Sequence, residues 1–225
     1  MASQTKQNTI ETKGLILDAA KKQFSVLGFS KVTMEEIAAE AGMGKASLYY
    51  YFTDKDSLFQ AVVKEEMQNF EEFIGVVLSK DIPAPQKIRE YVKERFRFFN
   101  RLLSLNFLEQ KNTGPMKPVL TRIYTEFRDR ELKVLHGIFK QGKAAGEFEI
   151  ASAERIAEAF VHLLAGLRIR FVRHSTSPVF DTKEFEKLVK EVTLITDIFI
   201  RGIGSRPATP ARRHTIKHAI ALSSR

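Results

Sequence analysis

The chain has 225 residues, 44% of them apolar, which is enough for one sizeable hydrophobic core or two small ones. It contains no cysteine, which excludes a disulfide framework and a thiolate metal site. The first residues lack the apolar run of a signal peptide, and no apolar segment approaches the length of a membrane span. We therefore expect a cytoplasmic protein with no membrane partner.

The formal net charge of +9 invites a nucleic-acid interpretation, but the distribution of the charge matters more than its size. Residues 1–60 carry seven lysines and seven acidic residues, so this segment is neutral. The segment from Ser205 carries four arginines and one lysine without any acid. Its two prolines favour a flexible basic tail over residues 205–225, although Ile216 and Ile220 would also fit one face of a short helix.

The first helices are predicted from their apolar spacing and their end signals. Apolar residues recur at helical spacing over residues 10–27, and Gly28 then predicts a helix end. Thr33 with Glu36 three residues later forms a capping box, which predicts the start of a short second helix. Gly42 ends this helix, and a turn follows.

A third short helix, over residues 45–52, contains three consecutive tyrosines. Successive helical residues point about 100° apart, so Leu48 and Phe52 share one face and Tyr50 lies almost opposite. Three neighbours cannot all face one core from a helix, so we expect Leu48 and Phe52 to anchor it and Tyr50 to point outwards. The alternative is that the tyrosines fill the seam between helices. Two short helices around a glycine turn predict a helix-turn-helix.

Helical periodicity continues in longer segments, and no stretch alternates as a strand would. Helices are predicted over residues 55–79, 86–107, 118–145, 152–174 and 182–203. The predicted fold class is all-α. It consists of an N-terminal three-helix helix-turn-helix domain (residues 9–56), a C-terminal helical domain (57–204) and the basic tail (205–225).

The segment TMEEIAAEAGMGKASLYYYF, residues 33–52, together with Lys55 resembles the DNA-binding domain of TetR-family transcriptional regulators. The match covers about residues 12–62, with cap, turn glycine, Leu-Tyr pair, final Phe and following Lys in register. The resemblance implies a bacterial, sequence-specific regulator, a repressor, that binds an inverted-repeat operator in double-stranded DNA as a homodimer. The residues it places at the DNA are Thr33, Gly44, Lys45, Ala46, Ser47, Tyr49, Tyr50, Tyr51 and Lys55.

The chemistry of these side chains suits DNA. In such regulators, the resemblance implies, Thr33 and Lys55 hold phosphates while the third helix enters the major groove. Tyrosine hydroxyls and lysine suit phosphate oxygens, whereas Ser47 or Lys45 can reach base edges and Ala46 can touch a thymine methyl. Gly44 differs from the capping side chain that is frequent at this position of the family, and it offers no side-chain acceptor.

The resemblance also implies a small-molecule effector that changes the spacing of the two recognition helices. The C-terminal half is rich in phenylalanine, which would suit a largely apolar effector, although core packing explains most of these residues individually. We expect Asn106, His136 and His162 to be polar groups that face inwards. Arg168 belongs to a basic cluster that also suits a helix end, so an anionic effector is the less favoured interpretation. The candidate ligand residues are Phe96, Phe99, Asn106, Phe107, Tyr124, Phe127, His136, Phe139 and His162.

The last two predicted helices carry the expected dimer surface. Small residues would let helices approach closely, and the apolar residues would make contacts between or within subunits. A four-helix seam in the dimer would bury this surface. The candidate residues are Ala159, Leu163, Gly166, Leu167, Val192, Ile195 and Phe199.

An enzyme is the first rival class. The sequence has no glycine-rich phosphate loop, nucleophile elbow or HExxH motif, so we expect no catalytic residue, cofactor or metal. His214 and His218 have ligand spacing but no third ligand. The second rival is an architectural or weakly specific DNA-binding protein that uses the basic tail, and its binding would depend steeply on salt.

Overall fold

The structure is a computed structural model that describes residues 2–104, 117–174 and 182–205. Within these ranges all regular structure is helical, apart from one isolated bridge between Phe148 and Gly204. The all-α prediction is confirmed. The described helices are α1 (Ala2–Leu27), α2 (Met34–Glu40), α3 (Lys45–Tyr51), α4 (Lys55–Ser79), α5 (Ala84–Ser104), α6 (Lys117–Ala144), α7 (Ala153–His174) and α8 (Thr182–Ile203).

Glycine determines where three of these helices end. Gly28, Gly42 and Gly146 follow α1, α2 and α6 with φ of 81°, 68° and 73°. This left-handed conformation costs glycine little, so the chain can leave the helix there. The predicted helix ends at Gly28 and Gly42 are therefore confirmed.

Helix α1 begins earlier than the apolar pattern indicates. The pattern starts at Ile10, whereas the helix starts at Ala2. The first turns are polar and depend on local bonds, for example that of the Thr12 hydroxyl with the carbonyl of Asn8 at 2.7 Å. Periodicity of apolar residues cannot find a polar helix segment, because it reports only the face that packs on a core.

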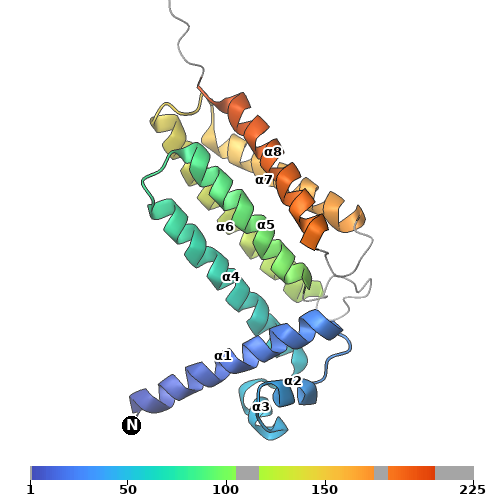
Figure 1. The fold of residues 1–225 in the computed structure, drawn as a ribbon. Coiled ribbons are helices and arrows are strands. Elements are labelled where there is room, and N and C mark those ends of the chain that lie inside the picture. The colour runs from blue at the N-terminus through green and yellow to red at the C-terminus, as the bar shows by residue number, and fades with distance from the viewer. Residues whose placement is uncertain (1, 105–116, 175–181, 206–225) are drawn as a thin grey trace, which may run out of the picture.

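Helices α1 to α3 and the start of α4 form one end of the molecule (Figure 1). Helix α1 lies across the start of α4, and α2 and α3 pack beneath them. Phe24 of α1, Phe29 of the following turn and Phe59 of α4 stack edge to face or tilted, with ring centroids 5.1–5.6 Å apart. This aromatic cluster fixes α4 relative to the helix-turn-helix.

Helices α4 to α8 form a second, longer bundle, in which α5 contacts α4, α6 and α8, and α6 packs on α7 (Figure 1). The predicted domain boundary after residue 56 falls inside α4. Leu58 and Phe59 at the start of α4 and Phe70 and Ile74 further along belong to one continuous cluster of buried residues. Among the described helices, none combines the length and apolar character that a membrane crossing requires.

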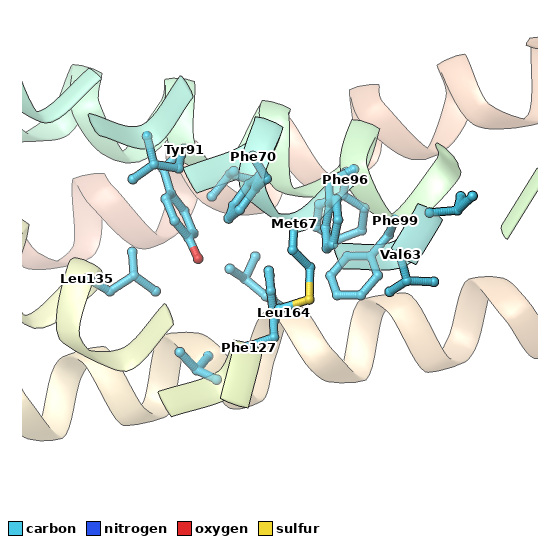
Figure 2. Packing of buried hydrophobic residues seen from close by; sticks show 14 of the residues in the cluster. Val63, Met67, Phe70, Tyr91, Phe96, Phe99, Phe127, Leu135 and Leu164 are labelled. Atoms are coloured by element: carbon cyan, nitrogen blue, oxygen red, sulfur yellow. The ribbon is translucent and has the colours of Figure 1, made fainter. Parts of the chain in front are cut away.

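Aromatic rings fill the middle of this bundle (Figure 2). Phe70 of α4, Phe98 of α5 and Phe127 of α6 stack in sequence, with ring centroids 5.1 Å and 5.2 Å apart. Phe99 meets the Phe127 ring edge to face at 5.5 Å. Core packing therefore accounts for most of the phenylalanines, as the residue type predicts.

Gly142 of α6 provides the first testable prediction. A Cβ at this position would overlap the Phe148 ring and lie 2.8 Å from the Ala84 Cβ. We expect Gly142→Ala to lower the free energy of unfolding by about 1–3 kcal/mol in urea denaturation, despite the better helix propensity of alanine. Gly137→Ala, on the exposed side of α6 with no atom within 4 Å, should instead gain up to about 1 kcal/mol. Equal effects at the two positions would contradict the packing of Phe148.

Candidate DNA-binding site

Thr33 begins α2 with a complete capping box. The Glu36 amide donates to the Thr33 hydroxyl at 3.2 Å, and the Thr33 amide donates to the Glu36 carboxylate at 2.8 Å. The predicted box is therefore confirmed. The hydrogen bond from the Thr33 amide holds the pKa of Glu36 below its ordinary value. At neutral pH the Glu36 carboxylate is therefore charged, and it is engaged in the capping box.

The turn between α2 and α3 is held by the backbone. Gly42, with its positive φ, donates to the Ala39 carbonyl at 3.1 Å, and Met43 donates to that of Ala38 at 2.9 Å. Gly44 then starts α3 in an extended conformation without any side-chain cap. The chain thus reverses within three residues, which brings α3 to the outer end of the molecule (Figure 1).

Helix α3 faces as predicted. Leu48 and Phe52 are buried in the N-terminal core, whereas the side chain of Tyr50 is 84% exposed. Tyr49 is exposed on one flank and Tyr51 is half-buried on the other, where its ring meets that of Tyr50 at 5.2 Å. The alternative in which the tyrosines fill a seam does not hold for Tyr50.

The nine residues predicted to contact DNA lie on this end of the molecule, but not all of them are open to solvent. Tyr51 and Lys55 are half-buried. The exposed ones are Thr33, Gly44, Lys45, Ala46, Ser47, Tyr49 and Tyr50. Backbone and side chains of the start of α3 are therefore accessible to a partner.

Lys45 carries an ion pair that the sequence analysis missed. Its ammonium contacts the Glu35 carboxylate of α2 and lies 5.7 Å from the centre of the Tyr49 ring. This hydrogen bond lowers the pKa of Glu35 and raises that of Lys45, so both are charged at neutral pH. Glu35 therefore holds Lys45 beside the tyrosines, at the expected DNA surface.

Lys55 is used inside the protein in this structure. Its ammonium donates to the Val32 carbonyl at 2.7 Å and lies 4.7 Å from the centre of the Phe29 ring. Burial lowers the pKa of this lysine. These contacts connect α4 to the loop before α2, and the phosphate contact of Lys55 stays a prediction.

The ion pair of Lys45 leads to a prediction about specificity. Glu35→Gln should increase affinity for random DNA and steepen its salt dependence, by about 0.9 in the logarithmic slope for each lysine that gains a phosphate. Fluorescence anisotropy with a random duplex at several salt concentrations measures both. The control is Glu71→Gln, which removes a carboxylate from the exposed ion pair with Arg130, further along α4. It should change neither the affinity for random DNA nor its salt dependence. An unchanged slope in Glu35→Gln would mean that Lys45 does not reach phosphate.

The structure divides the predicted ligand residues. Phe96, Phe99, Phe127 and Phe139 are buried in the bundle, and Tyr124 is exposed at its edge. Asn106 and Phe107 lie outside the described residues. The prediction that His136 and His162 face inwards is wrong, since both are exposed. The inward faces of α6 and α7 are formed instead by other residues, which are Leu135, Ile138, Phe139, Ala157, Phe160, Val161 and Leu164.

The predicted dimer residues also differ in their exposure. Val192 is buried within the subunit, because it lies on the inward face of α8 with Leu188, Thr196 and Ile200. Ala159 and Gly166 of α7 are exposed, and Leu163, Leu167, Ile195 and Phe199 are half-buried. The most exposed apolar residues of this face were not predicted: they are Ile169 of α7 and Leu194 and Ile198 of α8, the last two 61% and 60% exposed.

A capped short helix, a glycine turn and a second short helix with an outward tyrosine define a helix-turn-helix DNA-binding protein. A family profile described as "Bacterial regulatory proteins, tetR family" matches residues 16–62. The crystal structure of a transcriptional regulator from Cytophaga hutchinsonii is 36% identical with a TM-score of 0.76, over 85% of this chain and 97% of the other.

Two further comparisons agree. The HTH-type transcriptional repressor BepR of Brucella suis is 29% identical over 72% of this chain and 81% of its own length. A solved complex of SmeT with triclosan has the same fold, at 18% identity and a TM-score of 0.66 over 88% of this chain and 96% of that one. The chain belongs to the TetR family of bacterial transcriptional regulators. These relatives are regulators, not enzymes.

Proposed function

We propose that the protein is a repressor that acts in the cytoplasm and binds an inverted-repeat operator as a homodimer, and that a small molecule controls this binding. The observation that carries the DNA-binding part is the outward Tyr50, on a helix whose opposite face is anchored by Leu48 and Phe52. Repression is supported by the similarity to BepR, which is described as a transcriptional repressor. In this proposal residues 9–56 form the DNA-binding domain and residues 57–204 the effector and dimer domain, with α4 shared between them.

Helix α3 enters the major groove in this proposal. Lys45 and Ser47 lie in its first turn, where side chains of a recognition helix meet base edges, and both are exposed. Ala46 leaves space for a thymine methyl. Tyr49 and Tyr50 point to the sides of the groove, where their hydroxyls can donate to phosphates.

The outer face of α7 and α8 is the proposed dimer surface. The two helices meet where the Phe160 ring of α7 and the Phe199 ring of α8 lie with centroids 4.5 Å apart, and Ile169, Leu194 and Ile198 expose apolar side chains on these helices. Ala159 and Gly166 on the same side would allow close approach of a partner helix. A two-fold axis through this face would place two copies of α3 on one side of the dimer.

The dimer surface can be tested by charge. The double variant Leu194→Glu, Ile198→Glu should be a monomer in sedimentation velocity, because an interface that must bury unpaired carboxylates is strongly disfavoured. The variant should also lose operator binding, because a monomer contacts only one half-site and binds it weakly. Val76→Glu places the charge on an equally exposed apolar residue of α4 and should remain a dimer. A dimeric double variant would exclude this face.

The effector part rests on a pocket of about 330 Å³ between α4 and α6. Its volume is within the range of ligand sites, about 300–1,000 Å³, and its lining is mainly apolar. Phe70, Ile74 and Leu78 of α4 contribute to this lining. Because α4 also packs on α1, a ligand here has a direct mechanical connection to the DNA-binding end. SmeT, of the same fold, holds triclosan.

Selection of bound duplexes from a random library at near-physiological salt tests the proposal as a whole. A single inverted repeat would support the dimeric, sequence-specific regulator. Salt-sensitive binding without a motif would support the architectural alternative, whose basic tail lies outside the described residues. The selected duplex then serves as the probe for effector screening.

A further inference from the structure

Two arginines from different helices converge on one aromatic ring inside the bundle. The guanidinium carbon of Arg95 (α5) lies 4.8 Å from the centre of the Phe99 ring, and that of Arg168 (α7) lies 5.0 Å from it. Arg168 also lies 5.1 Å from the centre of the Tyr124 ring of α6. Three helices therefore contribute to one site that combines positive charge with aromatic rings.

Arg95 is held in a buried network. Its side chain is 1% exposed and pairs through two nitrogens with Glu131 of α6, whose carboxylate also accepts from the Tyr91 hydroxyl at 3.0 Å. Burial raises the pKa of Tyr91 well above its usual range, so the tyrosine is neutral. The remaining nitrogen of Arg95, Nη1, is buried and has no hydrogen-bond partner within the described ranges. An unmade bond at such a depth is costly unless a ligand completes it.

Arg168 lacks a counter-ion among the described residues. Its Nε is buried without a hydrogen-bond partner in the described part of the chain, and its guanidinium lies over the Phe99 and Tyr124 rings. The other buried carboxylates of the bundle, Glu66 and Glu94, pair with Arg101 at 2.7 Å and 3.0 Å. Because Arg95 and Glu131 cancel each other, the site keeps one uncompensated positive charge.

We propose that the effector carries a single negative charge, a carboxylate on an apolar body, which pairs with Arg168 and accepts from Nη1 of Arg95 beside Phe99. The inference rests on the proposed function and specifies the chemistry of its effector. One charge neutralises the site, whereas a dianionic phosphate monoester would leave it with a net negative charge next to Glu131. Guanidinium groups suit carboxylates because they offer several donors in one plane.

The apolar pocket shares a wall with this charged site. Tyr91, Phe127 and Glu131 line the pocket, and of these Phe127 contacts Phe99 while Glu131 contacts Arg95. An apolar body beside Phe127 and an anionic end beside Phe99 would thus touch adjacent sides of the same aromatic layer.

The test compares carboxylates with neutral amides of the same shape. Decanoate and phenylbutanoate, against decanamide and phenylbutanamide, are titrated into the full-length protein by calorimetry, with the melting temperature followed in parallel. We expect at least one carboxylate to bind and its amide to bind about tenfold or more weakly. Arg168→Gln should weaken carboxylate binding by a similar factor and leave amide binding unchanged.

Two controls keep the result interpretable. Arg128→Gln removes an exposed arginine of α6 and should bind the carboxylates as the parent does. Arg168→Gln should lower the melting temperature of the free protein only slightly, because it removes the contacts with the Phe99 and Tyr124 rings but no ion pair, and a purely structural arginine would not change the preference for acid over amide. Amides that bind as well as the acids, unchanged binding in Arg168→Gln, or no binding of either acid by the folded parent would overturn the inference.

The operator separates this inference from the proposed function. If the protein selects an inverted repeat but Arg168 has no effect on carboxylate binding, only the effector chemistry is wrong. If no repeat is selected, the proposed function fails whatever the probes do. If a carboxylate releases the selected duplex from the parent protein but not from Arg168→Gln, the effector site is connected to operator binding.

Discussion

Replacing Glu131 by glutamine should lower the free energy of unfolding by about 3–5 kcal/mol. The substitution preserves shape but leaves the guanidinium of Arg95 buried without an opposite charge, and it weakens the acceptor of the Tyr91 hydroxyl. Both partners of the pair are almost fully buried, so water cannot replace the lost interaction. Urea denaturation followed by circular dichroism measures the change.

Two variants show whether the loss comes from the broken pair. Glu126→Gln, on the exposed side of the same helix, should stay within about 0.5 kcal/mol of the parent. Methionine at both Arg95 and Glu131 removes the two charges together and should recover most of the stability, because an apolar replacement of a buried pair is often neutral. A stable Glu131→Gln variant would mean that Arg95 finds another partner or water.

Tyr50→Ala should reduce operator affinity about a hundredfold or more. A hydrogen bond to a charged phosphate contributes about 1.5–3 kcal/mol, and a symmetric dimer loses it twice. The side chain is almost fully exposed, so the melting temperature and the dimer should not change. Anisotropy with the selected duplex gives the affinity, and sedimentation checks the oligomeric state.

Tyr50→Phe separates the hydroxyl from the ring. If the tyrosine donates to a phosphate, the phenylalanine variant should lose most of the affinity that alanine loses. If the ring packs on a sugar or a base, phenylalanine should retain it. Parent-like affinity of Tyr50→Ala would show that α3 meets the DNA with another face.

The parts of the site that were predictable are those that local sequence encodes. The capping box of Thr33 and Glu36 spans one turn, and the left-handed turn at Gly42 needs a residue without a Cβ. The facing of Tyr50 follows from its distance along the helix to Leu48. The predicted helix starts and ends of the C-terminal half also lie within about two residues of those observed, because polar and Pro-rich breaks mark them. The predicted end at residue 107 is the exception, since it lies outside the described residues.

The charged contacts could not be predicted, since they join residues that are distant in the sequence. Glu35 meets Lys45 only because the turn folds α2 against α3, and Arg95 meets Glu131 across two helices. His136 and His162 were misplaced for a related reason. A polar residue within an apolar helix is ambiguous until the inward face is known, and the neighbours of both histidines supply that face.

The uninterrupted core along α4 has a consequence for folding cooperativity. Since no break in the buried cluster separates the two halves, we expect heating to melt the subunit in a single transition. Binding at either end then stabilises the other. An operator bound to α3 should raise the temperature at which the distant bundle unfolds. Hydrogen exchange of the amides in that bundle should slow as well, by the factor that corresponds to the free energy that operator binding adds to unfolding.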